Sequence, residues 1–264
     1  MAARQQSSLR HRPGRDGAIR ASPAVRLTLL GGFELESGRR RLQAPPHVQR
    51  LLAFLALHDR PIRRTYVSGQ LWLDASQEQA FGSLRTTLWR LRRVTAPLVQ
   101  ATSTHLALAP SVAVDAHELA ARAERFLHRH PPLDPDEVEL LATAHELLPD
   151  WYEDWVTPER ERLSQLRLLA LEAACEELVA TGCYREATTA GLAAVATDPL
   201  RESVRRLLIT TYVGEGNYAE AARQFDDFRA RLKRELGLEP SFRMLELARA
   251  FGSAGSSRGA RRSM

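Results

Sequence analysis

Lysine is almost absent from the sequence: Lys233 is the single lysine, so 36 of the 37 basic residues are arginine. Arginine makes bidentate contacts with phosphates and base edges that lysine cannot make, although a GC-rich genome produces the same bias without a functional cause. Cysteine is also scarce. Cys175 and Cys183 have no second Cys or His pair at metal-ligand spacing around them, so we expect reduced thiols in an intracellular protein.

Several classes of protein are excluded by what is missing. The apolar runs fall well short of the ~20 residues of a membrane-spanning helix. The phosphate-binding Gly-x-x-x-x-Gly-Lys-Ser/Thr loop, the Gly-x-Ser-x-Gly nucleophile turn and the His-Glu-x-x-His zinc motif are absent. His128 and His130 stand beside Pro131 and Pro132, which is more typical of a helix end than of a metal site. We therefore expect no catalytic residues, metal or cofactor.

The length of 264 residues fits two modest domains. Residues 1–23 are rich in Arg, Ser, Gly and Gln without an apolar segment and predict a disordered basic tail, and residues 252–264 predict a second one. The folded body is expected over residues 24–251. From this length we expect neither a receiver nor an ATPase module.

The formal charge of +5 is unevenly distributed along the chain. Residues 1–110 carry 17 arginines and six acids, a net charge of +11, whereas residues 111–264 carry 20 basic and 26 acidic residues, a net charge of −6. A basic half can hold a polyanion and an acidic half is repelled by one, so we expect nucleic acid to contact the first half. A chance asymmetry of solvated surfaces is the alternative.

The basic half alternates between strand and helix patterns. Residues 25–30 and 33–36 alternate as short antiparallel strands, and residues 39–43 form a possible third. Apolar residues of 47–58 recur at helical spacing, and a second, short helix is expected over 65–72. Arg63 and Arg64 stand at its entrance, where we expect contacts with a DNA backbone.

The third helix, predicted over residues 77–93, carries the sharpest signal. Ser76 and Gln79 have the spacing of a capping box. Phe81, Leu84, Leu88 and Leu91 form one apolar stripe, so Gly82, Ser83, Arg85, Thr86, Trp89, Arg90 and Arg93 are left on the opposite face. No acidic residue occurs between Glu78 and Asp115. Such a face suits the major groove of DNA; a surface helix that is basic by chance is the alternative.

A hairpin follows this helix. Residues 98–101 and 105–108 predict two strands joined by Thr102, Ser103 and Thr104. A hairpin directly after a basic third helix is typical of a wing, and hydroxyl groups at its tip are suited to phosphate contacts.

This order of elements resembles the winged helix-turn-helix domain of OmpR/PhoB-type response regulators. More narrowly, it resembles the N-terminal half of the Streptomyces antibiotic regulatory protein (SARP) family. The resemblance rests on residues 25–31, 49–55, 70–72 and 84–93. It implies that some side chains of the third helix face base edges, namely Arg85, Thr86, Trp89 and Arg90. It also implies that Thr87, Arg92 and Arg93 hold the DNA backbone. Relatives more often carry a smaller polar residue at the position of Trp89.

The acidic half reads as helical and contains a repeat. Gly182, Tyr184, Glu186 and Ala187 recur 34 residues later as Gly216, Tyr218, Glu220 and Ala221, and 34 residues is the period of the tetratricopeptide (TPR) repeat. Residues 119–127 and 138–148 predict a degenerate earlier unit. The Trp151 to Trp155 cluster is interpreted as two core tryptophans with solvated acids rather than as a binding site.

We therefore predict an α+β winged helix-turn-helix domain at 24–110 followed by an all-α, TPR-like domain at 111–251. The second part resembles the bacterial transcriptional activation domain of SARP proteins. The resemblance implies an activator that binds double-stranded DNA at promoter repeats, contacts RNA polymerase holoenzyme, is a possible homodimer on DNA and controls secondary-metabolite genes. The alternative is a repeat-protein adaptor whose N-terminal domain no longer binds DNA; an acid-free basic helix argues against it.

Overall fold

The computed structural model describes residues 25–93, 97–129 and 134–260. The predicted tail at 1–23 lies outside these residues. The elements follow one another as β1 (Val25–Thr28), β2 (Glu34–Ser37), β3 (Arg40–Arg41), α1 (Pro46–Ala56), β4 (Ile62–Arg63), α2 (Arg64–Leu71), α3 (Gln77–Leu91), β5 (Val99–Ala101), β6 (His105–Leu108), β7 (Val112–Val114), α4 (Asp115–Arg129), α5 (Pro135–Thr143), α6 (Thr157–Thr181), α7 (Tyr184–Thr197), α8 (Glu202–Glu215), α9 (Tyr218–Leu236) and α10 (Phe242–Ala260). The predicted class, a small α+β part followed by a helical part, is confirmed.

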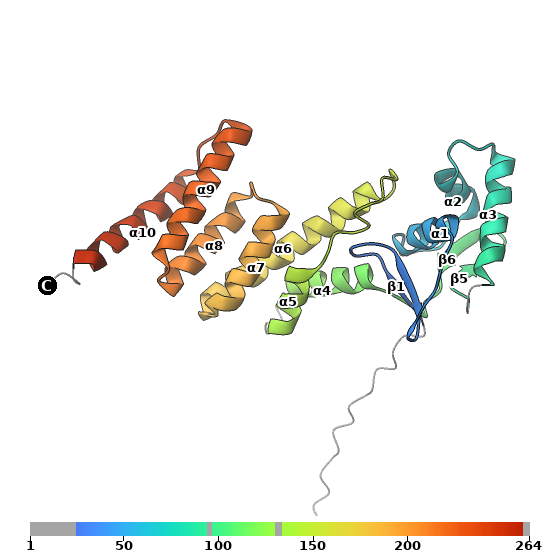
Figure 1. Cartoon of the computed structure of the whole chain (residues 1–264), viewed down its shortest axis with the longest axis horizontal. Coiled ribbons are helices and arrows are strands. Elements are labelled where there is room, and N and C mark those ends of the chain that lie inside the picture. The colour runs from blue at the N-terminus through green and yellow to red at the C-terminus, as the bar shows by residue number, and fades with distance from the viewer. Residues whose placement is uncertain (1–24, 94–96, 130–133, 261–264) are drawn as a thin grey trace, which may run out of the picture.

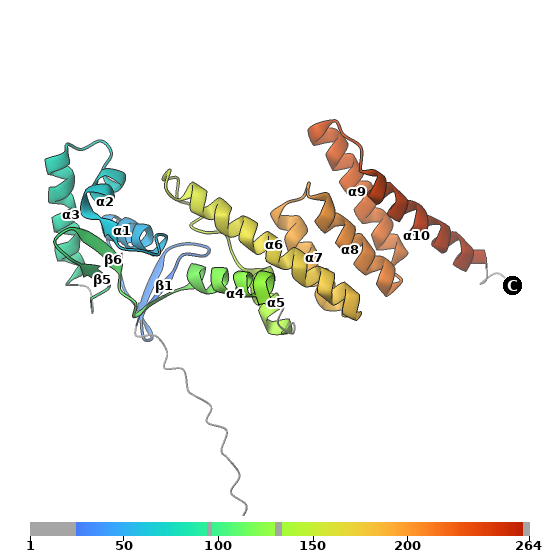
Figure 2. The ribbon, with the colours of Figure 1, turned by 180° about the vertical axis from the view of Figure 1, so that it is seen from behind.

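The molecule is elongated, with α3 at one end and α9 and α10 at the other (Figures 1 and 2). Two small sheets frame the first three helices. One has the strand order β3-β2-β1-β7 and the other the order β4-β6-β5. None of the helices in the described ranges combines the length and apolar character that a membrane crossing requires.

Strand β7 was not predicted. It pairs in parallel with β1, so that Val25 lies opposite Val112 and Leu27 opposite Val114. The first sheet therefore includes residues 112–114, beyond the boundary expected at residue 110. Three residues are too few for a period-2 pattern to stand out, and the partner strand lies more than 80 residues earlier in the chain.

The winged-helix half (β1 to β7) and the helical half (α4 to α10) share one hydrophobic core. A single cluster of buried side chains extends from Val25 in β1 to Val204 in α8. A second cluster holds α1, α2 and α3 on the sheet β4-β6-β5 through residues such as Phe54, Leu84 and Leu106. The winged-helix half is therefore packed against the helical half rather than tethered to it.

Backbone N–H groups at the end of β1 donate hydrogen bonds to the helical half. Asp115, the first residue of α4, accepts the N–H of Leu29 at 2.8 Å on Oδ1 and the N–H of Leu30 at 3.0 Å on Oδ2. Its Oδ1 also accepts the N–H of Ala116 at 2.8 Å. One carboxylate thus caps a helix and closes a strand end.

The connecting segment (residues 144–156, between α5 and α6) completes this joint. Gly31 donates its N–H to the carbonyl of Glu146 at 2.7 Å, and the N–H of Leu148 donates to the carbonyl of Leu29 at 2.9 Å. Leu148 has a positive φ of 43°. The helix predicted over 138–148 therefore ends at Thr143, because the residues that follow pair with the end of β1 instead of continuing the helix.

The two tryptophans of the connecting segment, predicted as core residues with solvated acids beside them, are half-buried and pack against the winged-helix half. Trp155 meets the ring of Phe54 edge-on at 5.1 Å, and Trp151 stacks on Phe33 at 6.1 Å. Between them, Glu153 forms an ion pair with Arg50 of α1 at 3.1 Å. Aromatic pairs of this kind contribute about 0.5–1.5 kcal/mol beyond their buried area.

The predicted repeat corresponds to the helix pairs α6/α7 and α8/α9. Gly182 and Gly216 end α6 and α8 with φ of 76° and 83°, a left-handed conformation that glycine adopts at the lowest cost. Ala187 and Ala221 are fully buried where the helices of each pair approach. We expected a disordered tail over residues 252–264. Helix α10 instead continues to Ala260, so residues 252–260 are helical.

Replacing Asp115 by Asn tests the joint. An Asn amide can accept with one oxygen only and turns its NH₂ group toward a backbone N–H, so we expect a loss of about 1–3 kcal/mol in the free energy of unfolding, measured by urea denaturation. Asp134→Asn is the matched control. Asp134 caps α5 through the N–H of Asp136 at an exposed site, where Asn serves as well as Asp. Equal losses in both variants would contradict the role of Asp115.

The two free cysteines differ in reactivity. Cys175 is buried and Cys183 is exposed, and burial raises the pKa of the Cys175 thiol to about 11. Because the thiolate is the form that reacts, iodoacetamide at pH 8 should alkylate Cys183 while Cys175 stays protonated and unmodified until the protein is denatured. Mass spectrometry of the peptides measures this, and equal labelling in the native protein would rule it out.

Candidate nucleic-acid interface

Local capping determines where α3 begins. The Ser76 hydroxyl accepts the N–H of Gln79 at 3.4 Å, and the Gln79 side-chain oxygen accepts the N–H of Ser76 at 3.1 Å. The predicted capping box is therefore present. The buried stripe of the helix consists of Ala80, Leu84, Thr87 and Leu91, while Phe81 and Leu88 are half-buried.

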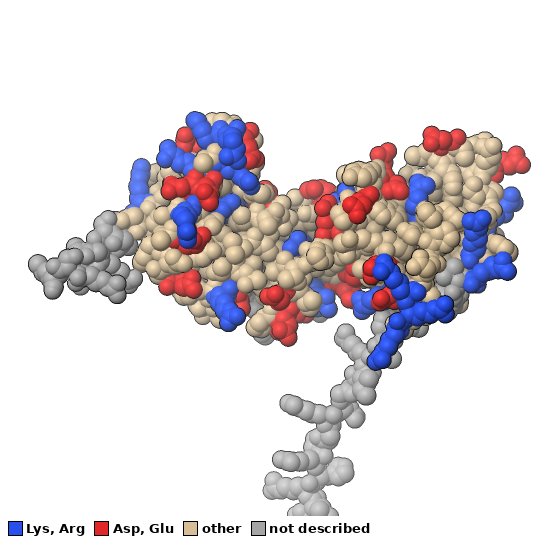
Figure 3. Space-filling model, viewed as in Figure 1, with Lys and Arg blue, Asp and Glu red and all other residues tan. Residues whose placement is uncertain are grey.

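The opposite face of α3 presents the predicted side chains to solvent. Arg85, Thr86, Trp89 and Arg90 are exposed, as are Arg92 and Arg93 directly after the helix. In the space-filling view, basic side chains line the outer edge of the end that α3 occupies (Figure 3). The helix lies at the extremity of the molecule, so a long ligand can approach this face without contacting the helical half (Figure 1).

The prediction that Thr87 contacts the DNA backbone is wrong. Thr87 is 1% exposed and its hydroxyl donates to the carbonyl of Ser83 at 2.9 Å. Its position, three residues after Leu84 and four before Leu91, places it on the core side of the helix. A buried hydroxyl with a satisfied hydrogen bond is not available to a ligand.

The arginines of this face have no carboxylate partner. None of the ion pairs among the described residues includes Arg85, Arg90, Arg92 or Arg93. The arginines of α9 differ, because Arg223, Arg229, Arg231 and Arg234 all pair with glutamates. The positive charge of α3 and its C-terminal end is thus left free for an external anion.

Trp89 and Arg93 form a stacked pair. The Arg93 guanidinium lies 4.5 Å from the centroid of the Trp89 ring, and the Trp89 side chain remains 57% exposed. A cation above an aromatic face is attracted by the ring electrons and loses orientational freedom. The two residues therefore present one flat, positively charged surface.

The structure brings the second-helix entrance and the wing together. Strand β4 pairs with β6, so that Arg63 lies opposite His105, and the N–H of Arg64 donates to the carbonyl of Thr104 at 2.9 Å. Arg63 is exposed and Arg64 is half-buried. The predicted backbone contacts at 63–64 and 102–104 thus form one surface beside α3.

The wing hydroxyls are partly occupied within the turn. Thr102 accepts the N–H groups of Thr104 and His105 through its hydroxyl oxygen, at 3.3 and 2.9 Å. The Thr104 hydroxyl lies 2.9 Å from Nδ1 of His105. Thr102, Ser103 and Thr104 are all exposed, so the tip is both preorganised and accessible.

One residue of this surface was missed. His47, at the start of α1, accepts a hydrogen bond from Nη1 of Arg90 on its Nε2 atom at 3.3 Å. Burial and, to a smaller extent, the charge of Arg90 lower the pKa of His47. No periodicity links residues 43 positions apart, so a single sequence holds no signal for this contact.

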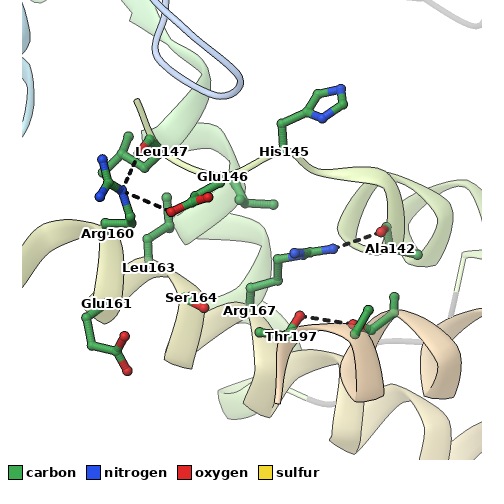
Figure 4. Close-up of a pocket in the computed structure, with 13 residues that line it drawn as sticks. Ala142, His145, Glu146, Leu147, Arg160, Glu161, Leu163, Ser164, Arg167 and Thr197 are labelled. Atoms are coloured by element: carbon green, nitrogen blue, oxygen red, sulfur yellow. Dashed lines mark hydrogen bonds and ion pairs between the residues drawn. The ribbon is translucent and has the colours of Figure 1, made fainter. Parts of the chain in front are cut away.

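A separate hollow of about 410 Å³ lies in the helical half, lined by residues of α5, α6, α7 and the connecting segment (Figure 4). Both arginines of this hollow bind other groups of the same chain. Arg160 binds the carbonyl of Leu147 and the carboxylate of Glu146, and Arg167 binds the carbonyls of Leu141 and Ala142. Within the described ranges no group of three or more His, Cys, Asp and Glu side chains could hold a metal ion.

Comparison with known proteins gives a family match for the helical half and relatives that match most of the chain. Residues 139–251 match the family described as the bacterial transcriptional activator domain. The chain is 30% identical over 244 residues to regulatory protein AfsR of Streptomyces griseus, a match that covers 85% of this chain and 24% of that protein. For AfsR of Streptomyces coelicolor the identity is 30% over 259 residues, which covers 89% and 25%. The chain is thus similar to AfsR-like regulators of the SARP family. It spans about a quarter of the length of the curated relatives that it matches.

A solved structure confirms the arrangement of the fold. Mycobacterium tuberculosis EmbR, in complex with a low-affinity phosphopeptide, matches with a TM-score of 0.69 at 19% identity, over 88% of this chain and 65% of that one. At this identity the likeness concerns the fold alone. The matched domain is described as one of bacterial transcriptional activators, and the AfsR relatives are named regulatory proteins, in agreement with the role in transcription expected from the sequence.

Removing an arginine from the α3 face tests the interface. If Arg85 and Arg90 reach base edges, Arg85→Ala and Arg90→Ala should each weaken binding to a preferred duplex by about 1–3 kcal/mol, with a smaller effect on unrelated DNA. Fluorescence anisotropy with both duplexes measures the difference. Arg185→Ala, at an exposed site on α7, is the control for loss of one positive charge. Unchanged preference in both α3 variants would exclude this face from base recognition.

Proposed function

We propose that this chain is a sequence-specific, DNA-binding transcription regulator of the SARP family. The face of α3 enters the major groove, with Arg85, Thr86, Trp89 and Arg90 toward base edges. Arg92, Arg93, the α2 entrance and the wing contact the backbone. A protein with this function works on the bacterial nucleoid, in the cytoplasm.

The free arginines of α3 carry this proposal. Arginines without an internal carboxylate partner on an exposed helix keep their charge available for an anionic ligand. The surface around them adds hydroxyl groups and an aromatic plane but no carboxylate from Arg85 to Ala109. A docking surface for an ordinary protein partner commonly includes acids, whereas the negative charge of a phosphate backbone favours a surface without them.

We further propose that the helical half acts in activation through proteins, by contacting RNA polymerase holoenzyme or a second copy of the chain on adjacent promoter repeats. The exposed apolar side chains around the turn between α9 and α10 support a protein contact: Leu236, Leu238 and Phe242 are 54%, 56% and 66% exposed. The resemblance to the SARP family implies regulation of secondary-metabolite genes, such as antibiotic clusters, as the biological role, and the relatives, named regulatory protein AfsR, support a regulatory role in general.

Selection from a random duplex library tests the function without a known operator. Purified protein is incubated with the library, bound duplexes are amplified over several rounds, and enriched sequences are compared. We expect a repeated motif and salt-dependent affinity. A protein that enriches no motif and shows no salt-dependent affinity for any duplex would support the adaptor alternative.

Arg92→Ala separates backbone contact from base reading. Arg92 follows the last residue of α3 and is exposed. The variant should lose affinity for the selected duplex and for unrelated duplexes alike, and the slope of log affinity against log salt should become shallower by roughly one phosphate contact. Titrations at four salt concentrations measure the slope. An unchanged slope would place Arg92 away from the backbone.

A further inference from the structure

His47 and Arg90 meet across two elements of the candidate interface. They line an open hollow of about 520 Å³ together with Trp72, Gln79, Gly82, Ser83, Thr86 and Thr87. Among these lining residues, Arg90 is the charged side chain that faces His47. The hollow follows the flank of α3 and is part of the same exposed surface.

The chemistry of the contact determines the state of the imidazole. A guanidinium has donors only, so Nε2 of His47 must carry the lone pair that accepts from Arg90 at 3.3 Å. The ring is then neutral, with its proton on Nδ1. Burial and the neighbouring charge of Arg90 act in the same direction, since both lower the pKa of His47.

The contact distinguishes Arg90 from its neighbour on the same face. Arg85 is exposed on α3, and no hydrogen bond or ion pair to another described side chain holds its guanidinium. The guanidinium of Arg90 is held on one side by a partner from α1. Immobilising a long side chain before binding reduces the conformational entropy that binding must remove.

We propose that His47 is a positioning residue for DNA recognition: its neutral imidazole holds the Arg90 guanidinium in the orientation that presents it to a base edge. This role rests on the proposed function of the α3 face. Direct contact between a protonated His47 and a phosphate is the competing role, and the experiments below separate the two.

The first experiment needs no DNA. Nitrogen-15 NMR of the imidazole in the full chain should show the Nδ1–H tautomer for His47. In Arg90→Ala the pKa of His47 should rise, because a neighbouring positive charge and a donor to the neutral ring are both removed. Arg85→Ala is the matched control and should leave the His47 titration unchanged. An unchanged titration in Arg90→Ala would overturn the contact itself.

The second experiment measures affinity for the duplex selected from the random library. His47→Leu removes the acceptor and should weaken binding about 3- to 10-fold, the range of one hydrogen bond. His47→Gln supplies an amide oxygen in place of Nε2 and should restore binding to within about 2-fold of the wild type. In an Arg90→Ala background, His47→Leu should cause no further loss, since the two residues act as one unit.

His128→Leu is the control for loss of a histidine, because His128 lies on α4, an element of the helical half, and is exposed. If His47→Leu weakens binding to selected and unrelated duplexes equally, and does so in the Arg90→Ala background as well, the positioning role is overturned. A direct contact between His47 and a phosphate is then favoured. If the wild-type chain binds the selected duplex and His47→Leu binds it equally well, the positioning role is overturned while the proposed function stands. Absence of any DNA binding by the wild-type chain would end the proposed function and this role together.

Discussion

The end of β1 depends on acceptors and donors from another part of the chain. The N–H groups of Leu29 and Leu30 bind the carboxylate of Asp115, and Gly31 and Leu29 exchange hydrogen bonds with the connecting segment. A hydrogen bond contributes about 0.5–1.5 kcal/mol net and more where the acceptor is charged, so these bonds oppose separation of the halves in addition to the shared core. Asp115 begins α4 and the connecting segment leads into α6, so this joint sets where these two helices start relative to β1.

The same residue type serves two purposes in the two halves. In the helical half, arginines stabilise the fold: Arg160 and Arg167 bind carbonyls near the end of α5, and buried Arg205 donates to Gln224. On α3 the arginines meet solvent, an aromatic ring or a neutral histidine. A count of arginines cannot separate these uses, because the difference lies in the partners that the fold supplies.

Features governed by neighbours in the sequence could be predicted, including the Ser76–Gln79 capping box and the left-handed glycines at 182 and 216. Contacts between distant residues could not, among them the pairing of β7 with β1 and of Arg90 with His47. Thr87 is a different case. Its spacing from Leu84 and Leu91 already indicated burial, and the assignment to DNA came from family resemblance, which transfers a position without testing its exposure.

A continuous core from β1 to α8 joins the two halves through packed side chains of the described residues. If α3 is seated in a groove, the direction in which α9 and α10 project from the duplex is determined as well. Because DNA completes a turn in about 10.5 base pairs, moving the binding site by five base pairs would carry that far end to the opposite side of the double helix. The rotational phase of the site, and not merely its distance from a promoter, would then decide which proteins the helical half can reach.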